Sequence, residues 1–223
     1  MKNVESELHA WARNAGAVAA AVGWLAAAVL CASCGGARPV HYYTLQLSAP
    51  APVGDPRTNF VLGVQQFRAA EPLRDDRILY YESPTQLNFY QQHRWDADPA
   101  TMLSALAQRE LQQTGAFAQV WLAPYLGNVD YVLRGQVLSF SELDYQGGVK
   151  ARVGLGLTLL HSPDRKVVWS AQRQVENVVQ EQGVPGVVNA LNAATKQILD
   201  EMIPGIVAQV ESDYRASTGK TTH

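Results

Sequence analysis

Cysteine is almost absent from the chain, and its placement excludes several kinds of site. The 223 residues include two cysteines, Cys31 and Cys34, and both lie within the first 34 positions. The rest of the chain therefore holds no thiol for an internal disulfide, a cysteine-ligated metal or a catalytic nucleophile.

An excess of charge of one sign is also missing. The sequence has 18 basic and 20 acidic side chains, which gives a net charge of −2. Such a chain has no field that gathers a polyanion, and this argues against nucleic-acid binding through a basic face. With 17% charged and 47% hydrophobic residues, the composition is typical of a folded protein. The length fits a single domain.

The common signatures of catalytic and cofactor sites are lacking as well. There is no H-E-x-x-H, G-x-S-x-G, Walker or dinucleotide-binding motif. The histidines that follow the first segment are not paired at metal-ligand spacing: His41, His93, His161 and His223. Catalysis needs titratable groups that converge. We therefore expect a protein that is not an enzyme and binds no cofactor or metal.

Two acidic pairs have a structural and a functional interpretation. Asp75 and Asp76 lie in a charged loop, which is typical of a solvated turn. Asp96 and Asp98 could form a carbohydrate-binding or hydrolytic pair, but Asp98 followed by Pro99 is the pattern of a helix start. We favour the turn and the helix cap, and a hydrolase of envelope substrates stays as the weaker alternative.

An alanine-rich segment without charge occupies residues 15–30. A charged start, an apolar core and then small residues are typical of a secretory signal. The segment is short for a spanning helix, which needs about 20 strongly apolar residues. Cys31 and Cys34 close this segment, whereas a redox Cys-x-x-Cys pair opens a helix inside a folded domain. We favour a lipoprotein signal over a plain signal or anchor and over a redox pair.

The residues around Cys34 resemble a bacterial lipobox. Ala32 and Ser33 supply the small residues before this cysteine, whereas Leu30 stands where a small residue would be needed if Cys31 were the acylated one. The resemblance implies that Cys34 carries the lipid, palmitate included, and becomes the first residue of the mature protein. Several acyl chains at about 0.8 kcal/mol per buried methylene form a permanent anchor. By the same resemblance, Gly35 favours sorting to the outer membrane.

This interpretation divides the chain into four parts. We expect a lipoprotein signal peptide at 1–33, a short lipidated tether at 34–41, a folded domain at 42–212 and a flexible tail at 213–223. The eight steps from Cys34 to Tyr42 span at most about 28 Å. The domain is therefore expected to work close to its membrane.

The folded part is predicted to be a single α+β domain, with a mostly antiparallel or mixed β-sheet packed against two main helices. Strict alternation of apolar residues with polar residues or glycine over 149–159 predicts a half-buried strand within a meander at 131–175. The apolar phase shifts from Val137 to Leu138 and Phe140, which predicts a β-bulge. Gly154 and Gly156 are expected to form a smooth patch on the exposed face of the sheet.

The remaining elements follow from turn residues and periodicity. Strands are expected at 42–47, 60–67, 77–81, 86–91 and 118–122. One helix is expected between Asp98 and Gly115, and a second near Pro185, which Pro204 should kink or end. Six aromatic residues on the early strands are expected to be half core and half partner- or membrane-facing: Tyr42, Tyr43, Tyr80, Tyr81, Phe89 and Tyr90.

Several of these stretches, taken together, resemble the ABC-type transport auxiliary lipoprotein family. The similar stretches are Y-Y-T-L after the lipobox, R-I-L-Y-Y-E-S-P-T-Q-L-N-F-Y-Q-Q-H-R-W at 77–95, and G-A-F-A-Q-V at 115–120. The helix between them, the later meander and the C-terminal helix also match the layout of the family, so that the resemblance spans 42–204.

The resemblance implies a lipid-anchored, periplasm-facing outer-membrane protein of Gram-negative bacteria without catalytic residues. Its implied partners are a periplasmic MCE-domain protein, an inner-membrane permease and an ABC ATPase, in a system that moves lipids or other hydrophobic compounds between the membranes. Only the lipidated cysteine carries over as a site residue, and it falls on Cys34. A homo-oligomer stays open. A lipoprotein activator or assembly factor of another envelope machine is the alternative function.

Overall fold

The structure is a computed structural model, and it describes residues 38–47, 54–124, 127–145 and 147–218. The contacts divide the chain into Met1–Pro39 and Val40–His223. Every helix and strand among the described residues belongs to the second unit, and the account below concerns that unit. It confirms the predicted fold class, an α+β domain with two helices and one mixed sheet.

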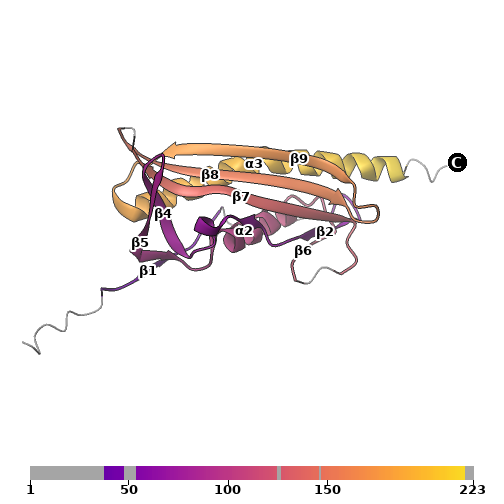
Figure 1. The fold of residues 1–223 in the computed structure, drawn as a ribbon. Helices are drawn as coiled ribbons and strands as arrows, with labels where there is room; N and C mark the ends of the chain where they lie inside the picture. Colours follow the sequence, from indigo (N-terminus) through magenta and orange to yellow (C-terminus); the bar gives the residue numbers. More distant parts are fainter. Residues whose placement is uncertain (1–37, 48–53, 125–126, 146, 219–223) are drawn as a thin grey trace, which may run out of the picture. The chain divides into compact units, whose positions relative to one another are not determined.

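Three long antiparallel strands form the main part of the sheet (Figure 1). They are β7 (Tyr131–Asp144), β8 (Val149–His161) and β9 (Val167–Val178), paired in chain order. The apolar residues of the predicted alternation, Val153, Leu155, Leu157 and Leu159, are all 1% exposed or less. The expected meander is confirmed, because one face of β8 is buried as the alternation requires.

The predicted β-bulge is present where the apolar phase shifts. The register between β7 and β8 skips one residue between Val137 and Ser139. Phe140 thereby joins the core at 1% exposure, whereas Leu138, the bulged residue, is 37% exposed. Leu138 lies over the glycines of β8, since a Cβ added at Gly156 would be 3.9 Å from its Cδ1. The expected smooth patch is therefore partly covered by this leucine.

The other edge of β7 pairs with three strands in succession along its length, and all three are parallel to it. These strands are β2 (Val61–Val64), β3 (Arg68–Ala69) and β4 (Arg77–Ser83). Beyond β4 lies β5 (Gln86–Trp95), antiparallel, and then β1 (His41–Tyr43), while β6 (Gln119–Leu122) pairs with β2. A single 3-10 turn, η1 (Glu71–Leu73), links β3 to β4.

Two of the expected strands are shorter than predicted. The strand at the start of segment 42–47 is His41–Tyr43, and within 60–67 only Val61–Val64 is a strand, since β3 begins after this segment, at Arg68. At Phe67 the backbone N–H donates to Ser104 Oγ at 2.8 Å instead of to a neighbouring strand. Side-chain competition for the backbone of this kind ends strand pairing. Phe67 nevertheless packs in the core at 3% exposure.

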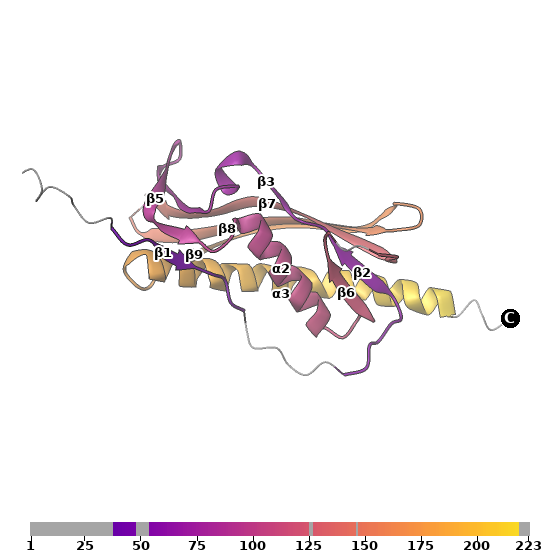
Figure 2. The same cartoon turned by 90° about the horizontal axis from the view of Figure 1, so that it is seen from below.

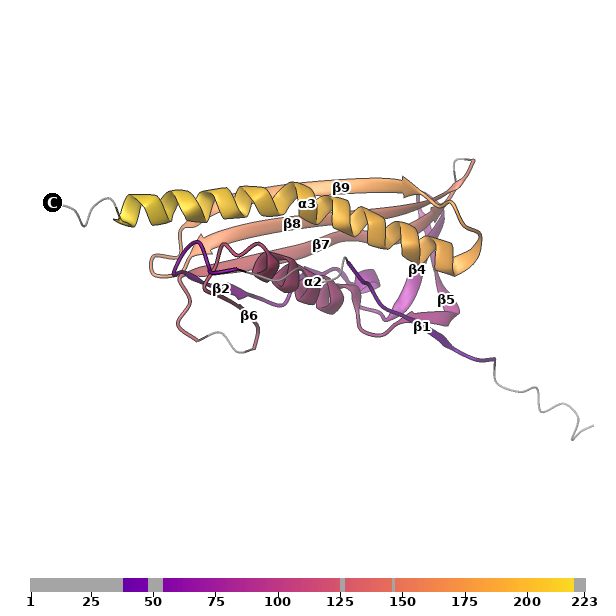
Figure 3. The ribbon, with the colours of Figure 1, turned by 180° about the vertical axis from the view of Figure 1, so that it is seen from behind.

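Both long helices lie on the same face of the sheet, as Figures 2 and 3 show. Helix α2 (Pro99–Gln113) begins as predicted, because the side chain of Asp98 accepts from the backbone N–H of Thr101 at 3.1 Å. Gly115 follows its end in the left-handed region, with φ 64°, which glycine adopts without strain. Helix α3 (Gly183–Thr218) runs along β8 and β9.

Of the two outcomes expected at Pro204, a kink or an end of the second helix, the end does not occur, since α3 continues to Thr218. Pro204 is exposed, and apolar residues on both sides of it, such as Ile203 and Ile206, are buried in the core. Packing of this stripe compensates for the hydrogen bond that proline cannot make. The expected tail from Asp213 is thus helical as far as Thr218, and the hydroxyl of Tyr131 donates to Asp213 at 2.9 Å.

Candidate functional site

The expected lipid-attachment residue, Cys34, lies outside the described residues, and so does Cys31. The first described strand, β1, begins at His41, the last residue of the expected tether. The geometry of the site therefore concerns the surfaces of the folded domain, and acylation of Cys34 stays a prediction.

A cluster of histidine and tyrosine rings lies where β1 pairs with β5. The parallel register sets His41 beside His93, and their rings stack with centroids 5.2 Å apart and planes at 17°. The hydroxyl of Tyr43 hydrogen-bonds with His93 Nδ1 at 2.9 Å. Burial, and after it the nearby His41, lowers the pKa of His93, because both disfavour the imidazolium. The hydrogen bond and the stacked rings hold His93 in place, and its surroundings favour the neutral form over the imidazolium.

A buried carboxyl group lies beside this ring cluster. Glu142 of β7 is 4% exposed, and it accepts a hydrogen bond from the hydroxyl of Tyr90 at 2.9 Å. The ring of Tyr90 contacts both Tyr80, with centroids 4.7 Å apart, and His93. Burial raises the pKa of Glu142, and Asp144 adds to this, while the bond from Tyr90 lowers it. Burial at this position thus disfavours the charged carboxylate of Glu142.

The aromatic residues of the early strands divide between core and surface, although not into the expected halves, since four of the six pack against the core and Tyr80 is half-buried. Tyr43, Tyr81, Phe89 and Tyr90 pack against the core cluster. Tyr42 alternates to the other side and is 65% exposed. Tyr42 is thus available for contact with a partner or a membrane, as the sequence predicts for part of this set.

The charged loop before β4 is held together by ion pairs. Arg77 Nη2 lies 2.6 Å from Asp75 Oδ2, and Arg94 Nη1 lies 2.8 Å from Asp76 Oδ1. The hydrogen bonds from Arg77 lower the pKa of Asp75 to about 2. Both carboxylates are therefore committed to shaping this turn, in agreement with the structural interpretation of the loop.

The second acidic pair and the histidines do not converge on one point. Asp98 caps α2, as described, and the backbone N–H of Asp96 donates to the carbonyl of Tyr43 at 2.8 Å. His161 pairs with Asp164 at 2.9 Å in the turn between β8 and β9. Within the described ranges no three His, Cys, Asp or Glu side chains are grouped so as to hold a metal ion. His223 lies outside these ranges.

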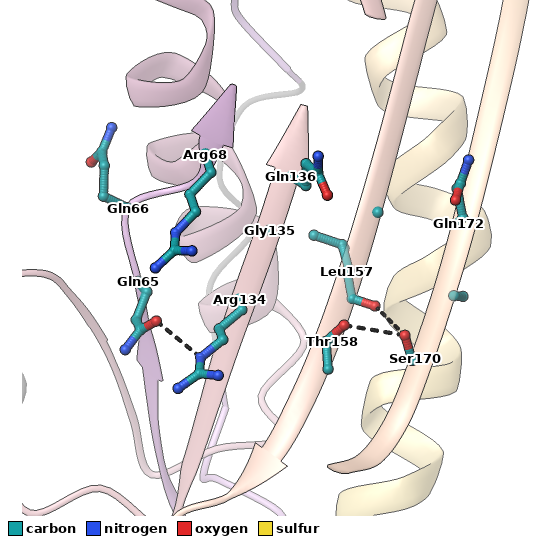
Figure 4. Close-up of a pocket in the computed structure, with 12 residues that line it drawn as sticks. Gln65, Gln66, Arg68, Arg134, Gly135, Gln136, Leu157, Thr158, Ser170 and Gln172 are labelled. Carbon is teal, nitrogen blue, oxygen red and sulfur yellow. Dashed lines mark hydrogen bonds between the residues drawn. The ribbon is translucent and has the colours of Figure 1, made fainter. Parts of the chain in front are cut away.

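A polar hollow lies on the sheet face that is turned away from α2 and α3. It has a volume of about 490 Å³ and crosses β7, β8 and β9, with Gln65, Gln66 and Arg68 along its side. Figure 4 shows Arg68, Arg134 and Gln65 close together in front of the strands, with the helices behind the sheet. Arg134 Nε donates to Gln65 Oε1 at 3.2 Å, and Thr158 Oγ1 lies 3.1 Å from Ser170 Oγ. We call this feature the polar hollow.

Sequence reasoning missed both the buried carboxyl group and the polar hollow. Glu142 and Tyr90 are 52 positions apart, and no local pattern relates them. The arginines of the hollow come from β3 and β7, which pair only through the tertiary fold. The one available signal was the pair Gly154 and Gly156, of which Gly156 lines the hollow, whereas Gly154 is buried next to Ser139 and Leu138.

Neither of the two helices in the described part of the chain is both long and apolar enough to cross a membrane. The fold thus defines a class of protein, a one-domain α+β protein in which two helices cover one face of a mixed sheet. The model of the ABC-type transport auxiliary lipoprotein component family matches residues 43–203. The chain belongs to this family, which confirms the resemblance found in the sequence.

Solved structures share the fold. Protein XCC0632 from Xanthomonas campestris is 24% identical, with a TM-score of 0.68, over 78% of this chain and 98% of the other. The structure of an uncharacterized protein is 19% identical, with a TM-score of 0.61, over 76% of this chain and 99% of the other. At these identities the likeness concerns the fold alone. Among functionally curated proteins the chain has no match.

Proposed function

We propose that this protein is a non-enzymatic outer-membrane lipoprotein subunit of an MCE-domain ABC transport system. In this role it docks the periplasmic MCE protein, and the system moves lipids or other hydrophobic compounds between the inner and outer membranes. The observation that carries the proposal is the match of the transport auxiliary lipoprotein model to residues 43–203. That match supports association with an ABC transport system, and the MCE partner and the cargo class are our extension of it.

The anchor at Cys34 gives the proposal its location. A tether of at most about 28 Å between Cys34 and Tyr42 would hold the domain against the periplasmic side of the outer membrane. The rings at β1 and β5, with Tyr42 exposed, would then face either the lipid surface or a partner close to it. The domain would act by binding, since its titratable groups serve in turns, caps and packing.

Substitution of the two cysteines tests the anchor. Cys34→Ser should release the protein from the membrane into the periplasmic fraction, because no acyl chain can be attached. Cys31→Ser is the matched control, and it should leave the protein in the outer-membrane fraction. The measurement is density-gradient separation of membranes followed by immunoblotting. Reversed phenotypes of the two variants would show that the acylated residue is misassigned.

Co-purification tests the docking. The wild-type protein, extracted in mild detergent, should retain the cognate MCE-domain protein, and the ATPase and permease should follow through it. If the protein instead retains components of a different envelope machine, the alternative role of activator or assembly factor is correct. The absence of any MCE protein from the eluate would contradict the proposal.

A further inference from the structure

The polar hollow has the chemistry of a binding site for carboxylates. We propose that it binds an extended acidic segment of a partner protein, with carboxylate groups held by Arg68 and Arg134. This inference goes beyond the membrane anchor and the transport role, and it needs neither of them.

The two arginines differ from the other arginines of the described strands because they lack an acidic partner. The described strands contain six arginines, one in each of β3, β4, β5, β7, β8 and β9. Four of them are paired with an acidic side chain within 4 Å: Arg77, Arg94, Arg152 and Arg173. Arg68 and Arg134 have no such pair among the described residues, and both line the hollow.

The geometry of the two arginines suits a shared anionic ligand. Both side chains are exposed, and Figure 4 shows both guanidinium groups on the same side of the strands, next to Gln65. Gln65 accepts from Arg134 Nε at 3.2 Å, which steadies this guanidinium and leaves its outer N–H groups free. A guanidinium presents a planar fork that binds a carboxylate through two parallel hydrogen bonds.

The rest of the hollow suits the backbone of an extended segment. Strands lie about 4.8 Å apart, so the path from residues 65–68 across β7 and β8 to β9 is on the order of 14 Å, or about four extended residues. Amide and hydroxyl groups follow this path, with Gln136, Thr158, Ser170 and Gln172 among the lining residues. These groups both donate and accept hydrogen bonds, as peptide groups require.

A phospholipid fits the same lining less well. Leu157 is the one large apolar residue that contributes to the lining, and it is 1% exposed. Apart from Leu157, the lining consists of polar side chains, glycine and alanine, whereas sites for acyl chains are mostly apolar. A membrane surface could meet the arginines only through its anionic headgroups, and the experiment below separates that case.

The floor of the hollow offers a way to block it without disturbing the fold. Gly156 lies in β8 between Gln136 of β7 and Gln172 of β9, and a Cβ added there would meet nothing nearer than Leu138 Cδ1, at 3.9 Å. This distance is an ordinary contact, and the backbone of Gly156 does not adopt a positive φ. Gly156→Val should therefore fold normally, as valine favours strands, and should fill the space that the segment needs.

The test uses the full chain in detergent and a fluorescein-labelled octapeptide with four glutamates, compared with the same peptide carrying glutamine instead. Fluorescence anisotropy should show binding of the glutamate peptide alone, weaker as salt rises. Arg68→Gln and Arg134→Gln should each raise the Kd about fivefold, as expected for loss of one exposed ion pair of about 1 kcal/mol. Gly156→Val should abolish binding while the thermal unfolding midpoint stays that of wild type.

Arg173→Gln is the matched control, because it removes one positive charge from the same sheet on the side that pairs with Glu201 of α3. It should leave the Kd unchanged within twofold. Equal binding by wild type, Arg68→Gln and Arg134→Gln would overturn the proposal. So would binding to vesicles containing phosphatidylglycerol that depends on these arginines while the peptide fails to bind. The assay contains no transport component, so either failure would leave the transport role untouched.

Discussion

The contact between Gly135 and Phe67 allows a quantitative test of how the sheet is packed behind the polar hollow. A methyl group at Gly135 would lie 2.3 Å from Phe67 Cδ1 and 2.5 Å from Cγ and Cε1. Carbon atoms in contact are normally about 3.5–4.0 Å apart. The substitution Gly135→Ala therefore forces the ring of Phe67 to move by about 1 Å within a core where it is 3% exposed.

The expected cost follows from two opposing effects. Overpacking of a core costs about 1–3 kcal/mol, and alanine recovers roughly 0.5–1 kcal/mol because glycine weakens a strand through its conformational freedom. Gly135 does not have a positive φ, so the backbone itself accepts alanine. We predict that Gly135→Ala lowers the free energy of unfolding by about 1–2 kcal/mol.

A double-mutant cycle shows whether the ring is the cause. Phe67→Leu alone should cost about 1–2 kcal/mol through lost burial. Combined with Gly135→Ala it should cost no more than it does alone, since the smaller side chain leaves room for the methyl group. The measurement is urea unfolding followed by tryptophan fluorescence. Additivity of the two single costs within about 0.5 kcal/mol would refute the contact. Gly148→Ala is the control, because a Cβ there meets nothing within 4 Å.

Two further predictions concern the cap of α2 and the buried carboxyl group. Asp98→Ala should lower the free energy of unfolding by about 1 kcal/mol, measured in urea, while Asp96→Ala should change it by less than about 0.5 kcal/mol; equal losses would contradict the capping role. Glu142→Gln should be more stable than wild type at pH 7, because Gln keeps the bond from Tyr90 and carries no charge to bury. The pKa of Glu142 is raised in the folded state, so the wild type loses stability as pH rises through that pKa. The gain in unfolding free energy from Glu142→Gln should therefore shrink towards pH 4. A gain that grows on acidification would contradict the raised pKa.

Local patterns in the sequence were sufficient for the meander, the bulge and the start of α2. The alternation over β8 reflects a strand buried on one face, and the phase shift at Val137 reflects one extra residue in β7. Asp98 followed by Pro99 describes a cap whose hydrogen bond needs no distant partner. In each case the cause lies within a few residues of the effect, and periodicity alone reveals it.

The features that sequence reasoning did not predict depend on residues far apart in the chain. Phe67 leaves the strand pattern because Ser104, on α2, takes its N–H. Helix α3 passes Pro204 because the buried stripe on both sides is packed against the sheet. Arg68 and Arg134 have no acidic partner among the described residues, and only the three-dimensional positions of the acidic side chains reveal this. For the same reason the candidate site was predicted from sequence at Cys34, where the signal is local, and not in the folded domain.

The central claim is that this domain acts from a lipid anchor at Cys34. Mass spectrometry of the mature protein, purified from the outer-membrane fraction and cleaved with a protease, tests it most directly. The account predicts an N-terminal peptide that begins at Cys34 and carries acyl chains, with residues 1–33 absent. An unmodified Cys34, or a mature protein that retains Cys31 on its N-terminal side, would contradict the claim.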